Sequence, residues 1–248
     1  MRRLIWESSW QGIEFHELGV KLNCFGRPSA EFYSRFYNAI FSKYDSFEAL
    51  PPPWKKIKSK TALEISKLIN DEATVLSIGS GLGYLDKEII KYRPELKINT
   101  YDFADNASNW SRTVSGINPV PSLDIGIKYQ FIFCSQLFYA LSNKELENLS
   151  RVIKTLLSEG GVFLTVDTSL NPDENGKKEK RNNSIKAMLK NLIRPLFFSV
   201  FARNYFQFWG WQRDNSEILK IFDKNGFIVE KAFPAVGQSF LLFRLADI

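Results

Sequence analysis

Short apolar runs alternate with amphipathic stretches from Ala73 to the end of the chain. Runs such as Val75–Ile78 predict buried strands, while the stretches between them carry apolar residues at helical spacing. The expected strands are residues 74–78, 96–101, 129–134, 162–167, 227–231 and 239–244, and the expected helices are 84–92, 143–158 and 214–224. Strands that alternate with helices predict an α/β fold whose mostly parallel sheet has helices on both faces. The last two strands follow each other closely, so a hairpin would add one antiparallel strand.

Two other parts of the chain lack this strand pattern. Residues 1–59 show no alternation, and the aromatics at positions 32, 33, 36, 37 and 41 recur with a helical period. We therefore expect residues 1–59 to form a helical N-terminal cap on a main domain of residues 60–248. A polar break at 168–181 precedes a basic and then aromatic stretch, 184–211, which we expect to be helical. Residues 168–213 would then be an insertion that forms a lid over a substrate.

The composition narrows the class of protein. The chain has 248 residues, of which 44% are hydrophobic and 24% charged, and this balance excludes a disordered chain, a collagen-like fibre and a disulfide scaffold. One His and two separated Cys residues cannot build a zinc site, so no metal is expected. No apolar run approaches the roughly 20 residues of a membrane span, and Glu7 interrupts the N-terminus before a signal-peptide core develops. We expect a cytoplasmic protein.

The net charge of +6 belongs to one segment. Residues 177–194 carry seven Lys or Arg residues against one acid, so the rest of the chain sums to zero. Three interpretations remain open: a solvated face, an attraction for anionic substrates, or a peripheral contact of residues 177–201 with an anionic membrane at its inner face. No stacking motif or RNA-binding module supports nucleic acid as a partner. The sequence does not indicate an oligomeric state.

A glycine-rich turn joins the first buried strand to a helix. Gly79, Gly81 and Gly83 allow a ligand to approach the backbone closely, and the helix start directs free N–H groups at it. Asp102 ends the second strand, 19 residues after Gly83, where an acid can accept the two hydroxyls of a ribose. The pattern indicates an adenosine-containing cofactor. Tyr84 stands where a dinucleotide fingerprint has its third glycine, which disfavours NAD, and the Lys-Ser/Thr of a P-loop is missing.

These segments resemble a known family, the class I S-adenosylmethionine-dependent methyltransferases. Residues 75–84 are similar to its first motif, Tyr101-Asp102-Phe103 to its ribose-binding second motif, and residues 156–164 to its helix–Gly-Gly–fifth strand signature. The resemblance covers about residues 60–248. It implies a Rossmann-like, seven-stranded, mostly parallel sheet with a helical N-terminal cap, and a helical insertion between strands five and six.

The resemblance also implies a set of residues that bind S-adenosylmethionine. One departure concerns Ser77, which stands where the family usually has an acid that helps to orient the methionine ammonium. Asp124 is the candidate acceptor for the adenine amino group, and Gln136 replaces the histidines that many relatives carry after the fourth strand. The expected cofactor-binding residues are Ser77, Gly79, Ser80, Gly81, Gly83, Tyr84, Asp102, Phe103, Asp124, Cys134, Ser135 and Gln136.

Residues for the acceptor and for proton transfer follow less directly. His16 is the only side chain that normally titrates near neutrality, so it is a candidate base, with a polar residue on the cap as the alternative. Asp167 ends the fifth strand and can orient an acceptor or cap a turn, and Tyr139 is a third catalytic candidate. Trp209, Trp211 and Arg213 in the insertion can hold a sugar or another ring, or pack on the sheet.

We therefore expect a methyltransferase that uses S-adenosylmethionine and methylates an oxygen of a small molecule or glycan, such as a bacterial surface polysaccharide. The alternative is a catalytically degenerate adenosyl-binding or membrane-associated scaffold. Ser77 and the absence of histidines after the fourth strand support this alternative. The two differ in one observable, since a scaffold would bind the cofactor, or nothing, without turnover.

Overall fold

The protein is built around a seven-stranded sheet with the strand order β10-β11-β8-β7-β4-β5-β6. The computed structural model describes residues 2–103, 115–123, 126–168 and 205–246. Strands β4 to β8 run parallel, whereas β11 lies antiparallel between β8 and β10. The strands are β4 (Val75–Ile78), β5 (Ile98–Tyr101), β6 (Ile117–Pro119), β7 (Tyr129–Ser135), β8 (Leu157–Asp167), β10 (Phe227–Ala235) and β11 (Gln238–Leu245). The predicted mostly parallel sheet and its terminal hairpin are confirmed, and β6 is the strand that the pattern did not predict.

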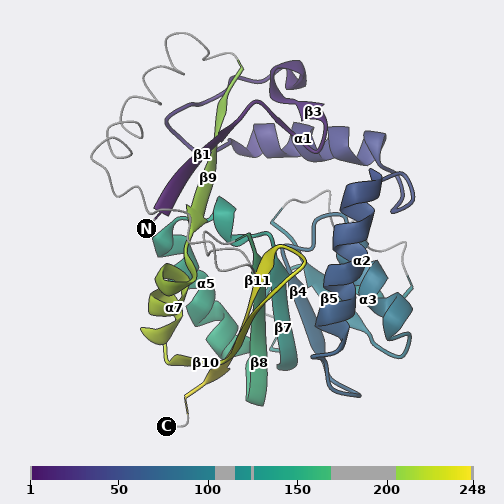
Figure 1. Cartoon of the computed structure of the whole chain (residues 1–248), viewed down its shortest axis with the longest axis vertical. Coiled ribbons are helices and arrows are strands. Elements are labelled where there is room, and N and C mark those ends of the chain that lie inside the picture. Colours follow the sequence, from purple (N-terminus) through teal and green to yellow (C-terminus); the bar gives the residue numbers. More distant parts are fainter. Residues whose placement is uncertain (1, 104–114, 124–125, 169–204, 247–248) are drawn as a thin grey trace.

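Helices cover both faces of this sheet (Figure 1). Helices α5 (Asn143–Leu156) and α7 (Asn215–Asp223) bury their apolar sides on one face, and α2 (Pro52–Ser66) and α3 (Tyr84–Tyr92) on the other. Alternation along β4 decides which side chain meets which pair of helices: Leu76 and Ile78 face α5 and α7, and Val75 faces α2 and α3. Ser77, two residues after Val75, therefore lies on the α2 and α3 face.

The helix starts follow from local sequence. Ser142 and Glu145 form a capping box at α5, in which each side chain accepts a hydrogen bond from the other residue's backbone N–H. Asp214 caps α7 by accepting from Glu217 N at 2.9 Å. Helix α3 begins directly after Gly83, so its first turn is part of the glycine loop.

The N-terminal region is only partly helical, contrary to the prediction. It forms β1 (Arg2–Glu7), β2 (Ser9–Trp10), β3 (Ile13–Glu14), the 3-10 helix η1 (Phe15–Leu18) and helix α1 (Ala30–Lys43). Strand β1 pairs antiparallel with β9 (Gln207–Arg213), so the prediction that the stretch up to Trp211 is helical is also wrong at its end. Consecutive apolar residues in both strands hide the alternation, and each strand finds its partner far along the chain. The predicted boundary after residue 59 falls inside α2. The basic segment lies outside the described residues.

An aromatic core holds the N-terminal region together. Phe15, Phe32 and Phe36 are buried against one another and against Trp209, which β9 inserts into the cluster. Leu82 and Tyr84 from the glycine loop belong to the same cluster. In Figure 1, α1 and the β1–β9 ribbon lie above one end of the sheet. We call β1 to β3, η1, α1 and β9 the cap.

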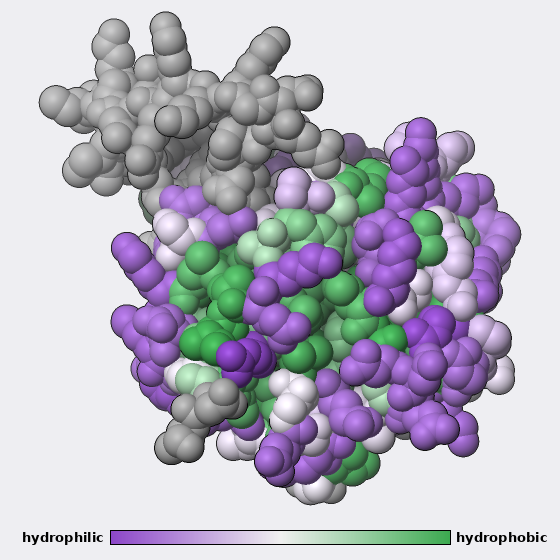
Figure 2. Space-filling model, turned by 60° about the horizontal axis from the view of Figure 1, so that its bottom comes forward, coloured by the Kyte–Doolittle hydropathy of each residue, from purple (hydrophilic) through white to green (hydrophobic). Residues whose placement is uncertain are grey.

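One face of the molecule carries a group of apolar side chains at its surface (Figure 2). Figure 2 turns the bottom of Figure 1 toward the viewer and shows apolar side chains gathered near the centre of that face, with polar side chains around them. Among the residues that the structure describes, no helix is both long and apolar enough to cross a membrane.

Candidate active site

The glycine loop between β4 and α3 has the conformation that its sequence predicts. Gly79 and Gly81 have φ angles of 73° and 54°, a left-handed region that favours glycine. A Cβ on Gly79 would approach Leu137 Cδ1 at 3.1 Å, whereas the space beside Gly81 is open, with nothing within 4 Å. Gly79 N donates to Tyr101 O at 2.7 Å, which fastens the loop to the end of β5. The loop therefore exposes backbone to an open space above the sheet.

Asp102 lies at the rim of the same space. Its Oδ2 accepts a hydrogen bond from Gly81 N at 2.7 Å, and its side chain is half-buried. The carboxyl is thus held beside the glycine backbone, and carboxylate oxygens are acceptors of the kind that ribose hydroxyls require. A glycine cradle with a fixed acid next to it fits the adenosine and ribose of S-adenosylmethionine.

The other predicted cofactor residues divide between the cradle and its surroundings. Ser80 lies in the loop, and Ser135 ends β7 at the same edge of the sheet. Tyr84 is buried in the aromatic core and its hydroxyl donates to Tyr44 O, so it links the loop to the cap. Phe103 is 59% exposed and its ring meets that of Tyr101. Two predictions cannot be placed at the cradle: Cys134 is fully buried on the α5 and α7 face, and Asp124 lies outside the described residues.

A buried carboxyl that the sequence did not single out lies below the loop. Asp86 in the first turn of α3 is 1% exposed. Burial raises its pKa to about 6, an effect that the Ser77 hydroxyl and the charge of the half-buried Lys58 on α2 partly offset. The charge of Asp102 adds to the rise, so the two acids lie in the same region. An acid three residues after Gly83 is the signal that could have found it.

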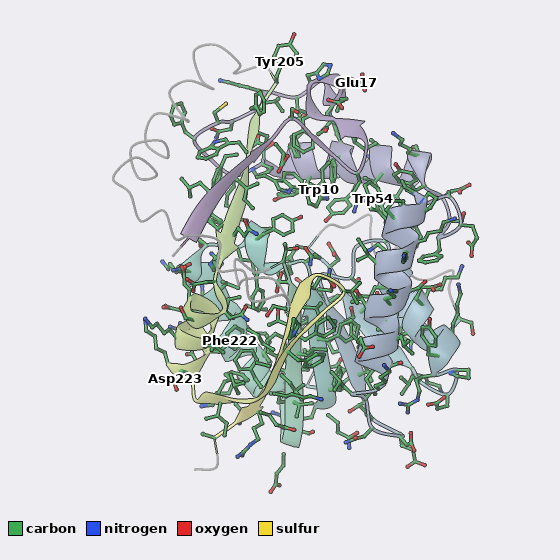
Figure 3. The ribbon with its side chains drawn as sticks, in the orientation of Figure 1. Trp10, Glu17, Trp54, Tyr205, Phe222 and Asp223 are labelled. Carbon is green, nitrogen blue, oxygen red and sulfur yellow. The ribbon has the colours of Figure 1, made fainter. Side chains whose placement is uncertain are left out.

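A second part of the site is a cavity of about 440 Å³ between the cap and the carboxyl ends of β7 and β8. Rings form much of its wall, and Glu7, Gln136, Asp167, Thr168, Gln212 and Arg213 add polar or charged groups. Figure 3 shows Trp10, one of these rings, where the cap faces the sheet. The lining residues are Leu4, Ile5, Trp6, Glu7, Trp10, Gln136, Phe138, Tyr139, Asp167, Thr168, Phe206, Trp209, Trp211, Gln212, Arg213 and Ile218. A cavity of this size fits a small molecule. We call it the aromatic pocket.

Asp167 supplies a carboxyl to the aromatic pocket. It is 8% exposed, and it accepts hydrogen bonds from Phe138 N at 3.3 Å and from the Thr165 hydroxyl. Burial raises the pKa of Asp167 to about 6, although these two donors and the charge of Arg213 oppose the rise. A carboxyl with a pKa close to neutrality, in a cavity, can accept a proton from a bound hydroxyl.

Tyr139 lies between the two parts of the site. Burial raises its pKa well above the usual range, and the charges of both Asp167 and Asp102 add to the rise. Its ring stacks on Trp209 at 5.9 Å. Tyr33 and Tyr37 on α1 approach the same region, since Asp102 and Tyr139 both raise the pKa of Tyr37 after burial, and Tyr33 acts on Tyr139. The sequence placed these two tyrosines on a helix but gave them no role.

Gln136 is held in an unusual conformation at the end of β7. Its φ angle is 56°, a left-handed value that is costly for a residue with a side chain and is common at functional sites. Its Oε1 accepts from the Thr168 hydroxyl at 3.2 Å, while its Nε2 is buried at the aromatic pocket without a hydrogen-bond partner among the described residues. A buried donor of this kind favours a ligand that brings an acceptor atom.

The three predicted substrate residues have different surroundings. Trp211 lines the aromatic pocket, half-buried, with its ring edge against Phe208 at 5.1 Å. Trp209 lines the pocket but is 2% exposed and contributes mainly to the core of the cap. Arg213 is 3% exposed, and its guanidinium donates to Phe138 O at 2.6 Å, to Leu141 O and to Asn143 Oδ1. Arg213 therefore fastens β9 to the loop after β7.

His16 lies apart from the acids of the site. Its side chain is 42% exposed, its Nδ1 is 4.0 Å from Glu14 Oε2, and its ring is 5.4 Å from that of Tyr205. Figure 3 shows Tyr205 at the end of the cap that points away from the sheet. The structure does not bring His16 to the aromatic pocket. Among the described residues, no group of three or more possible ligands could hold a metal ion.

Comparisons with known proteins place this geometry in a structural class. No family model and no curated protein sequence matches the chain. Human N-acetylserotonin methyltransferase in complex with SAM matches at a TM-score of 0.58 and 18% identity, over 90% of this chain and 61% of the other. The mitomycin 7-O-methyltransferase MmcR matches at a TM-score of 0.56 and 15% identity, over 87% of this chain and 57% of the other. The CcbJ methyltransferase from Streptomyces caelestis matches at a TM-score of 0.55 and 15% identity, over 84% of this chain and 96% of the other.

The chain has the fold of the class I S-adenosylmethionine-dependent methyltransferases. It spans about three fifths of the length of the first two proteins named above. The likeness at this identity concerns the fold, and the chemistry has to be argued from the side chains.

Proposed function

We propose that the protein is an S-adenosylmethionine-dependent methyltransferase that methylates an oxygen of a small molecule. The observation that carries the proposal is the position of the aromatic pocket, with Asp167 in its wall, beside the cradle formed by Gly79–Gly83 and Asp102. The S-adenosylmethionine of the matched complex supports the choice of cofactor. When bound, this cofactor supplies a methyl group that its sulfonium has already activated.

The chain would then have three tasks. The glycine backbone and Asp102 hold the adenosine end of the cofactor through its ribose hydroxyls. The rings of the aromatic pocket orient the acceptor, and Gln136 Nε2 donates to one of its oxygen atoms. Asp167 takes the proton of the reacting hydroxyl, since its carboxyl is ionised above pH 6 or so. Positioning supplies much of the rate enhancement in such a transfer.

The walls of the aromatic pocket support a flat or ring-shaped acceptor. Trp6, Trp10 and Trp211 offer ring faces and edges, on which either an aromatic ring or the apolar face of a sugar can stack. A planar hydroxylated molecule fits a cavity of about 440 Å³ better than an oligosaccharide, which would need more space. We therefore place planar hydroxylated molecules before glycans as acceptors.

Calorimetric titration tests the cofactor first. S-adenosylmethionine and its demethylated product should bind with micromolar affinity, NAD should not bind, and Asp102→Ala should lose the binding. An acceptor screen with S-adenosylmethionine then compares planar phenols with monosaccharides and oligosaccharides, and mass spectrometry detects the added methyl group. Binding of S-adenosylmethionine without transfer to any class would favour the non-catalytic scaffold, and binding of NAD alone would overturn the proposal.

A further inference from the structure

Asp86, Ser77 and Lys58 form a polar cluster where α2 and α3 cover β4. Asp86 comes from the first turn of α3, Ser77 from the face of β4 that α2 and α3 cover, and Lys58 from α2. Asp86 and Ser77 are 1% and 3% exposed. The neighbouring core consists of residues such as Ala62, Ile65 and Ile89. A buried carboxyl is costly in such surroundings unless it has a function or good partners.

The partners of Asp86 do not satisfy its carboxyl. The Ser77 hydroxyl lies close enough to lower the pKa of Asp86, but neither carboxyl oxygen receives a hydrogen bond of regular geometry from the described residues. Lys58 attracts the carboxylate across the cluster. Another buried acid of α3, Glu88, differs: it accepts from the Ser59 hydroxyl at 2.7 Å and pairs with Lys91. Asp86 thus retains capacity for a positively charged partner.

The cluster also lies next to the cofactor cradle. Asp86 follows Gly83 by three residues in the same turn, and Asp102, whose carboxyl holds Gly81 N, acts on it electrostatically. S-adenosylmethionine carries one ammonium, on its amino-acid end. Asp102 is engaged at the ribose position of the cradle, so it does not supply the charge that the ammonium requires.

We propose that Asp86, acting through Ser77, is the positioning carboxylate for the ammonium of S-adenosylmethionine. This inference rests on the proposed function. Ser77 on β4 carries no charge, so the negative charge for the ammonium would come from Asp86 in the first turn of α3 instead. The competing explanation is that Asp86 serves only as the structural partner of Lys58.

The test separates the amino-acid end of the ligand from its adenosine end. S-adenosylhomocysteine carries the ammonium, whereas 5′-methylthioadenosine has the same adenosine and sulfur without it. In calorimetric titrations, Asp86→Asn should weaken S-adenosylhomocysteine by about 10- to 100-fold, the size expected for a hydrogen-bonded charge, and should leave 5′-methylthioadenosine within about twofold. Glu88→Gln, on the same helix, should change neither affinity. Ser77→Asp combined with Asp86→Ser should restore the binding of S-adenosylhomocysteine.

Each other outcome contradicts the inference in a distinct way. Equal losses for both ligands would show that Asp86 is structural, and no loss for either would show that it does not reach the ammonium. If the wild-type protein binds neither ligand, the proposed function fails and the inference with it. Should Asp86→Asn not fold, the wild-type protein still decides: the affinity of S-adenosylhomocysteine relative to 5′-methylthioadenosine should fall below about pH 6 as Asp86 protonates, with Lys58 and Asp102 as the charged groups facing it. A ratio that does not change with pH would overturn the inference.

Discussion

The glycine cradle and the aromatic pocket are adjacent but built in different ways. The cradle consists of the backbone of one glycine turn and the carboxyl of Asp102, which the turn holds in place. The aromatic pocket instead collects side chains from β1, β9 and the segments that follow β7 and β8. Contacts made by backbone persist when side chains are replaced, so the cradle depends on few side chains, whereas the aromatic pocket depends on many. We therefore expect that mutations in the cradle alter cofactor binding and that mutations in the aromatic pocket alter turnover.

The largest expected effect is on turnover. Asp167→Asn keeps the shape of the side chain but removes the proton acceptor, so the turnover number should fall by about 10²- to 10⁴-fold, the usual contribution of a general base. Affinity for S-adenosylhomocysteine should remain within about threefold of the wild type because Asp167 lies in the other part of the site. Steady-state kinetics with any acceptor found in the screen provide the measurement. Undiminished turnover would remove Asp167 from the mechanism.

The second expected effect is on cofactor binding rather than on turnover. Asp102→Ala removes the acid that holds Gly81 N and accepts the ribose hydroxyls, so S-adenosylhomocysteine should bind about 100-fold more weakly. Phe103→Ala, at the neighbouring exposed position, serves as the matched control and should have a smaller effect. Calorimetry of the two variants checks the prediction. A loss at Phe103 that equals the loss at Asp102 would mean that ring contact dominates the cradle.

The same contrast explains what the sequence could predict. The loop Gly79–Gly83, Asp102 and the helix from Tyr84 to Tyr92 depend on residues close in the chain, and the structure has them as predicted. Backbone conformation at a glycine turn is set locally, so spacing alone carries the information. The parallel sheet followed for the same reason, because each strand and helix shows its own period.

The aromatic pocket could not be predicted in the same way. Its walls depend on the pairing of β1 with β9, whose residues Leu4 and Trp211 lie opposite each other from distant parts of the chain. Consecutive apolar residues in both strands resemble a helix as much as a strand. Arg213 illustrates the consequence: an arginine near tryptophans suggests a ligand, but its position in the fold turns it toward the carbonyls of Phe138 and Leu141.

The third prediction concerns stability and pH. Burial raises the pKa of Asp167 to about 6, whereas an unfolded Asp titrates near 3.9 or so. The protonated form therefore stabilises the fold fully below about pH 4, and this contribution is lost as the pH rises through about 6. Asp167→Asn does not titrate, so its free energy of unfolding relative to the wild type should rise by up to about 3 kcal/mol between about pH 4 and pH 7.5.

Urea unfolding of the wild type and of Asp167→Asn at the two pH values measures this difference. The pH dependence of the difference is the result that counts, since the substitution also alters the hydrogen bonds to Phe138 N and Thr165. A difference that stays constant with pH would show that burial does not raise the pKa of Asp167, and it would contradict the prediction.

The smallest effect tests how the cap is joined to the site. A Cβ on Gly210 of β9 would lie 2.0 Å from Tyr139 O, a backbone atom that cannot turn aside, so the strand would have to move. Gly210→Ala should destabilise the protein by about 1–3 kcal/mol and raise the acceptor KM, because Tyr139 and the β9 residues share the wall of the aromatic pocket.

Gly160→Ala is the matched control: its φ of 67° carries backbone strain, but nothing lies within 4 Å of the added methyl group. Unfolding curves and S-adenosylhomocysteine titration of both variants separate the two regions, since the cradle should bind its ligand unchanged in each. If Gly210→Ala weakens S-adenosylhomocysteine as much as it raises the acceptor KM, the cradle and the aromatic pocket form one mechanical unit, and the distinction between a backbone-built and a side-chain-built half does not hold.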